Sequence, residues 1–101
     1  MIRFLVLYER PADVEAFERH YWDVHIPLAK KLPGLRRYAV GRNPTAIRGG
    51  DPSFLVAELE WDDMASLQRA FESPEGKATA ADIANFAPEG VRSMVYELED
   101  A

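Results

Sequence analysis

Residues 14–32, with the sequence VEAFERHYWDVHIPLAKKL, form the segment that decides the fold. Its apolar side chains recur every three or four residues, which is the spacing of one face of an amphipathic helix. They are Val14, Phe17, Tyr21, Val24, Leu28 and Leu32. Asp13 is placed to cap the start of this helix, and Pro33-Gly34 predicts its end. Because Pro27 has no N–H and its ring crowds the carbonyl of Asp23, we expect a kink or a break between these two residues.

Segments rich in branched and aromatic residues flank this helix and predict the strands of a sheet. The four expected strands are residues 2–8, 35–40, 54–61 and 91–98. A second helix is expected after the capping residues Asp62-Asp63, and Ser73-Pro74 begins a short alanine-rich one. The resulting order, βαββαβ with one additional helix, is the ferredoxin-like α+β plan, in which helices cover one face of an antiparallel sheet. We expect a single domain that spans residues 1–101.

The expected sheet is apolar on both of its faces. In residues 54–61, one face carries Leu55, Ala57, Leu59 and Trp61, and the other begins with Phe54 and Val56. The helices can cover only one face, so the other face needs a different cover. A second copy of the same sheet is the simplest cover, because closed twofold dimers are the commonest oligomers. We therefore expect a homodimer that forms through the open sheet face.

Composition excludes several classes of function. The net charge is −5 and the pI is about 5.0, so neither nucleic acid nor an anionic membrane surface is an expected partner. The chain has no cysteine, which removes disulfides, thiolate nucleophiles and cysteine metal ligands. No segment approaches the roughly 18 apolar residues of a membrane span, and the apolar run at the N-terminus is too short for a signal peptide. We expect a cytoplasmic protein that does not contact membranes.

Two patches of the sequence resemble the EthD family of dimeric α/β-barrel proteins. The first is Phe17–Leu35, where His25, Pro27 and Pro33-Gly34 occur together, and the second runs from Ser73 through Asp82 to Asn85-Phe86. The resemblance implies a dimer whose two sheets pack into a barrel, with a cavity in each subunit between the sheet and the helices. The wider superfamily includes cofactor-free monooxygenases, lactone isomerases and polyketide-tailoring enzymes, and EthD proteins are linked to degradative pathways.

His25 is the main catalytic candidate. On an ideal helix it projects within the apolar stripe, beside Tyr21 and Leu28, and an imidazole titrates near neutral pH. The kink at Pro27 can leave backbone carbonyls unpaired. His25 is therefore either a catalytic or ligand-contacting residue, or a structural histidine that donates to a freed carbonyl.

His20 lies five residues before His25, and on an ideal α-helix the two diverge by about 140°. They could not chelate one metal ion as an i, i+4 pair would. Asp23 falls on yet another face of the helix. We therefore expect no metal site and place His20 at a cavity rim or on the surface.

Five further residues are candidates for contact with a substrate: Trp22, Tyr38, Phe54, Glu58 and Trp61. Trp22 projects away from the centre of the stripe and is either a rim or interface residue or packs on the following segment. Tyr38, Phe54 and Trp61, together with Tyr8, could line a cavity or belong to the ordinary core. Glu58 lies in the middle of a strand and could serve as an acid or base, or pair with Arg3 or Arg37.

Three functions compete. We favour a small dimeric enzyme, an oxidoreductase or else a lyase or isomerase, that binds no cofactor and acts on a small apolar aromatic or carbonyl compound, with His25 as the proton shuttle. The second is a non-catalytic binding protein for a small hydrophobic molecule. The third is a purely structural dimer, in which side chains fill the cavity. A cavity reached by both His25 and Glu58 favours chemistry, whereas a purely apolar one favours binding.

Overall fold

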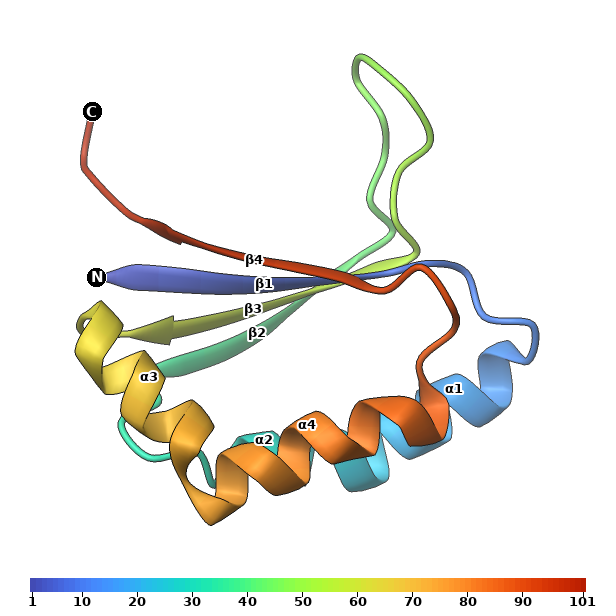
Figure 1. Ribbon diagram of the computed structural model, residues 1–101. Coiled ribbons are helices and arrows are strands. Elements are labelled where there is room, and N and C mark those ends of the chain that lie inside the picture. Colours follow the sequence, from blue (N-terminus) through green and yellow to red (C-terminus); the bar gives the residue numbers. More distant parts are fainter.

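A four-stranded antiparallel sheet with helices on one side is the architecture of the computed structural model, which describes residues 1–101 (Figure 1). The strands are β1 (Ile2–Tyr8), β2 (Arg37–Arg42), β3 (Leu55–Trp61) and β4 (Arg92–Glu97). The helices are α1 (Val14–His20), the π-helical turn η1 (Tyr21–His25), α2 (Ile26–Ala29), α3 (Met64–Glu72) and α4 (Pro74–Phe86). The strand order is β2-β3-β1-β4, and each neighbouring pair is antiparallel. This confirms the ferredoxin-like α+β fold, although β2 begins and ends two residues later than expected.

Side-chain caps fix where the helices begin. Asp13 accepts a hydrogen bond from the backbone N–H of Ala16 at 3.0 Å, and Asp63 accepts one from that of Ser66 at 2.8 Å. The hydroxyl of Ser73 accepts from the N–H of Gly76 at 3.0 Å, as expected of an N-cap followed by proline. These contacts place the starts of α1, α3 and α4 at the residues that the sequence indicates.

The expected irregularity near Pro27 takes the form of a π turn rather than a break. In η1 the backbone N–H of Ile26 bonds to the carbonyl of Tyr21, five residues back. The wider turn accommodates a proline that offers no N–H and would crowd a regular α-helix. It also brings residues five apart to the same side, so His20 and His25 share a face. The divergence expected from an ideal α-helix is therefore wrong for this pair.

The sheet has one covered and one open face. The covered face carries the largest fully buried side chains of the strands, which are Tyr8, Leu55 and Trp61. The strand register places Leu5, Leu7, Val56 and Met94 on the opposite face, together with an ion pair in which Arg3 lies 2.6 Å from Glu60. The long loop between β2 and β3 projects from the sheet on the side away from the helices (Figure 1). No helix has the length and apolar character that a membrane span requires.

Candidate functional site

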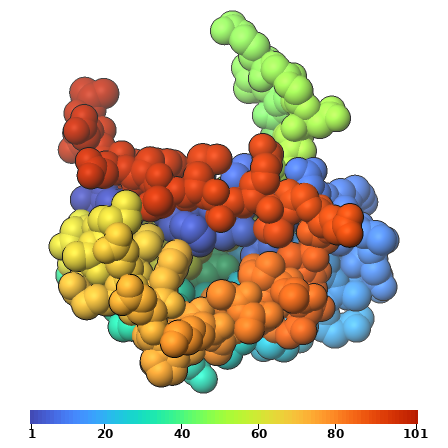
Figure 2. All heavy atoms as spheres, viewed as in Figure 1, coloured from blue at the N-terminus to red at the C-terminus, as the bar shows by residue number.

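A cavity of about 400 Å³ lies between the sheet and the helices. All four strands contribute residues to one wall, and the segment from His25 to Leu32 together with α3 and α4 supplies the other. Figure 2 shows the hollow between β4 and the helices α3 and α4. Eleven of the 17 lining residues are hydrophobic, and both the size and the lining suit a small apolar ligand. The structural-dimer hypothesis required a filled cavity and is disfavoured.

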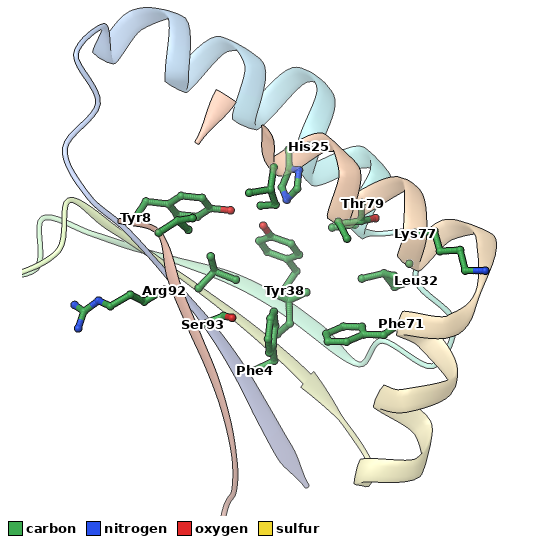
Figure 3. Close-up of a pocket in the computed structure, with 17 residues that line it drawn as sticks. Phe4, Tyr8, His25, Leu32, Tyr38, Phe71, Lys77, Thr79, Arg92 and Ser93 are labelled. Carbon is green, nitrogen blue, oxygen red and sulfur yellow. The ribbon is translucent and has the colours of Figure 1, made fainter. Parts of the chain in front are cut away.

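His25 ends the π turn and points its ring into this cavity (Figure 3). The residue is only 4% exposed, and its ring packs against Phe86 with centroids 4.7 Å apart. Its Nδ1 lies 3.0 Å from Oδ2 of Asp82 in α4. The partner of His25 is thus a carboxylate 57 residues away in sequence, and not a backbone carbonyl freed by Pro27.

Asp82 is the centre of a buried polar cluster. His20 approaches with Nε2 at 2.9 Å from Oδ1, and the side-chain amide of Asn85 donates to the same oxygen at 2.9 Å. Burial raises the pKa of Asp82, but the hydrogen bonds from Asn85, His20 and His25 together outweigh burial and lower it below its ordinary value. An ionised carboxylate only accepts hydrogen bonds, so both histidines must present an N–H to it.

This hydrogen bond assigns the tautomer of His25. With its proton on Nδ1, the neutral ring keeps the lone pair on Nε2, the nitrogen that does not contact Asp82. Burial lowers the pKa of His25, while the hydrogen bond that it donates to Asp82 raises it, and the net effect is a lower value than usual. His25 is therefore a neutral imidazole near pH 7 and can accept a proton from a bound molecule.

Tyrosine hydroxyls are further polar groups on this side of the cavity. The hydroxyls of Tyr21 and Tyr38 lie 2.7 Å apart, and that of Tyr8 is buried without a hydrogen-bond partner. Burial raises the pKa of Tyr38 to about 12 and raises those of Tyr8 and Tyr21 as well. All three phenols are neutral at physiological pH, and Tyr8 and Tyr38 line the cavity.

Of the residues proposed from sequence, His25, Tyr38 and Tyr8 line the cavity, whereas four others lie elsewhere. Trp22 is exposed and does not line the cavity, and its indole N–H donates to Glu18 at 2.9 Å. Phe54 packs edge-on against a neighbouring ring of α1, and Trp61 is fully buried with its N–H bonded to a backbone carbonyl.

Glu58, the fourth of these residues, also lies away from the cavity. Alternation along β3 turns its side chain to the open face, where it lies 3.6 Å from Arg3. It therefore pairs with an arginine, one of the two roles considered for it, and does not reach the cavity.

Asp82 is not among the site residues predicted from the sequence. A usable signal was present, because Asp82 lies beside Ile83 and at helical spacing from Phe86, which places a carboxylate next to apolar residues. No group of three or more His, Cys, Asp or Glu side chains is arranged to hold a metal ion.

The fold and the cavity define a ferredoxin-like α+β protein with an internal ligand-sized site, and comparison with known proteins gives its family. The EthD domain model matches residues 9–90. An uncharacterized 11.0 kDa protein from the thcB-thcC intergenic region of Rhodococcus erythropolis is 39% identical over 98% of this chain and 96% of its own length. The crystal structure of an EthD family protein from Bacillus halodurans is 38% identical, with a TM-score of 0.89 over 98% of this chain and 99% of that one. The chain belongs to the EthD family.

More distant structures share the fold alone. SnoaB, a cofactor-independent oxygenase from Streptomyces nogalater, is 17% identical, with a TM-score of 0.66 over 99% of this chain and 94% of that one. Other ferredoxin-like structures at 17–20% identity are dimeric proteins.

Proposed function

We propose that the chain is an enzyme that transfers protons on a small apolar aromatic or carbonyl compound held in the cavity, without a bound cofactor. The observation that carries the proposal is the His25–Asp82 pair. It combines a neutral imidazole in an apolar cavity with a buried carboxylate that fixes its tautomer.

In the proposed reaction, Nε2 of His25 takes a proton from the bound compound, and Asp82 stabilises the imidazolium that forms. The resulting anion reacts with dioxygen in an oxygenase, regains the proton at another atom in an isomerase, or in a dehydratase expels a neighbouring hydroxyl group, which takes the proton from the imidazolium and leaves as water. The fold is also that of a cofactor-independent oxygenase, which supports the proposal by analogy only.

The test is a comparison of wild type with His25→Ala and His20→Gln against a panel of aromatic polyketides and cyclic ketones. We expect His25→Ala to lose about 10²- to 10⁴-fold in kcat/KM, the usual contribution of a positioned base. His20→Gln should lose less, because His20 bonds the same carboxylate but does not line the cavity. Unchanged turnover by a folded His25→Ala variant would remove His25 from the mechanism.

We also propose a homodimer that forms through the open sheet face. Leu5, Leu7 and Val56 lie there with Met94, which is 48% exposed. The dimeric proteins of the same fold support this arrangement.

A binding protein for a small hydrophobic ligand is the second candidate function. The mainly apolar lining favours it, as does the position of Glu58 outside the cavity. A ligand that co-purifies and is recovered unaltered after incubation with the protein, under air and in D2O, would favour this candidate over the enzyme.

A further inference from the structure

Two tyrosine hydroxyls reach the cavity beside His25 and have no part in the proton transfer described so far. Tyr8 comes from β1 and Tyr38 from β2, and both line the cavity. In Figure 3 their hydroxyl groups and the ring of His25 turn toward the same space. A ligand within reach of His25 is therefore also within reach of both phenols.

The hydroxyl of Tyr8 is the more unusual of the two. The residue is fully buried, yet its oxygen has no hydrogen-bond partner in the protein. Nearly all buried polar atoms have a partner, because leaving one unpaired is costly. A bound molecule with an acceptor atom would supply the missing partner.

A count of the hydroxyl protons identifies Tyr38 as a second donor. Tyr21 and Tyr38 share one hydrogen bond of 2.7 Å, so one of their two hydroxyl protons is left over. Tyr21 is fully buried and does not line the cavity. If Tyr38 donated, the proton of Tyr21 would be buried without an acceptor. If Tyr21 donates, the proton of Tyr38 is free to point into the cavity, where a ligand can accept it.

We propose that the hydroxyls of Tyr8 and Tyr38 are paired donors to a carbonyl oxygen, and that the substrates are neutral ketones with a hydrogen on the carbon next to the carbonyl. This inference rests on the proposed function, since it adds an oxygen site to the base His25. A carbonyl oxygen has two lone pairs and can accept from both phenols.

The rest of the lining argues for a neutral ligand. Lys77 and Arg92 belong to it, but their side chains point away from the hydroxyls and from His25 (Figure 3). A carboxylate placed between the hydroxyls would therefore be a buried charge without a cationic partner, which is costly. A ketone avoids this cost in the ground state.

The proposed step needs no co-reactant. Nε2 of His25 takes the proton from the carbon next to the carbonyl. The electron pair of that C–H bond becomes the C=C bond of an enolate, and the π pair of the carbonyl moves to its oxygen. Both phenols donate to this oxyanion, and donors that are already in position in a mainly apolar cavity stabilise the developing charge. The imidazolium then returns its proton to the same carbon or to another one.

The oxygen site is tested with 2-naphthol, an analogue of an enol, and with naphthalene, which has the same rings without oxygen. Wild type should bind 2-naphthol more tightly than naphthalene. Tyr8→Phe should weaken 2-naphthol by about 3- to 10-fold, the value of one hydrogen bond, and leave naphthalene unchanged. Tyr38→Phe should have the same effect, but it also removes the hydrogen-bond partner of Tyr21. Tyr8→Phe is therefore the decisive variant. If folded Tyr8→Phe binds 2-naphthol as wild type does, or wild type shows no preference for it, the paired-donor site is overturned.

A second measurement separates this inference from the proposed function. NMR in D2O follows exchange of the hydrogens beside the carbonyl of 2-tetralone in the presence of wild type and each variant. If His25→Ala abolishes exchange but neither tyrosine variant changes the affinity for 2-naphthol, the oxygen site fails and the proposed function stands. If the tyrosine variants weaken 2-naphthol but wild type accelerates no exchange, the oxygen site stands and the proposed catalysis fails. Loss of exchange in both His25→Ala and Tyr8→Phe supports both.

Discussion

At the scale of single residues, the carboxylate of Asp82 decides which nitrogen of His25 can act as a base. We expect Asp82→Asn to lower kcat/KM by about 100-fold or more, because the neutral amide neither fixes the tautomer nor stabilises the imidazolium. The hydrogen bond and charge of Asp82 raise the pKa of His25. The acid limb of the pH–rate profile should therefore move to lower pH in the variant. An unchanged acid limb would show that another group controls it.

The pKa of His25 also makes folding depend on pH. Burial lowers this pKa below the ordinary 6.5, so below about pH 6.5 the unfolded chain binds the proton before the folded one does. The free energy of unfolding therefore decreases as the pH is lowered from about 6.5 to the lowered pKa of His25. The lowered pKa of Asp82 acts in the same direction below its ordinary 3.8, where only the unfolded carboxyl is protonated. We expect urea midpoints to fall between pH 7 and pH 5 in wild type and less steeply in His25→Gln. Equal slopes would exclude His25 as the source.

The hydroxyl of Tyr8 should lower the stability of the folded protein while it provides a hydrogen-bond donor for a ligand. Its buried hydroxyl has no partner in the protein, so Tyr8→Phe removes a desolvated oxygen and leaves the ring in place. We expect the free energy of unfolding to rise by about 1 kcal/mol, the lower end of the cost of an unsatisfied buried group. Urea denaturation measures it. A less stable variant would mean that the hydroxyl already has a partner in the folded protein.

At the scale of elements, the sequence predicts where helices begin and end better than it predicts the backbone geometry inside a helix. Asp13, Asp63 and Ser73 are local signals, because each cap bonds a backbone N–H three residues on. The irregularity near Pro27 could be predicted for the same local reason. Its form as a π turn could not, and it is this form that turns His20 and His25 to one side. An ideal helix therefore gave the wrong relation between the two histidines.

The junction of α3 and α4 positions Asp82, and Gly76 lets the two helices meet. A Cβ on Gly76 would collide with the backbone carbonyl oxygens of Ala70 and Phe71, which cannot yield as a flexible side chain would. We expect Gly76→Ala to reduce the free energy of unfolding by about 1–3 kcal/mol and to weaken the contact between Asp82 and His25. Gly50→Ala is the matched control, since nothing lies within 4 Å of its Cβ position. Equal urea midpoints for the two variants would contradict this account.

At the scale of the whole molecule, the site joins residues that no local pattern connects. His25 and Asp82 are 57 positions apart and meet only because η1 and α4 contact each other in the helical layer. Strand alternation was readable from the sequence, but not which face would enclose the cavity, so Glu58 was a candidate for substrate contact although it lies on the open face. Tyr38 lies on the face that the helices cover and was the substrate-contact candidate that lines the cavity.

The open face is the one large surface that the helices leave without cover, and it should determine the assembly of the molecule. Met94 is 48% exposed there, opposite Leu5 in the register of β1 and β4. A charge buried between two sheets lacks a partner, so we expect Met94→Glu to shift a wild-type dimer to single chains at micromolar concentration in analytical ultracentrifugation. Val24→Glu is the control, because Val24 is 41% exposed in the helical layer. If both variants lose the dimer equally, the interface does not lie on the open face. If the wild-type protein sediments as single chains, the proposed homodimer is refuted.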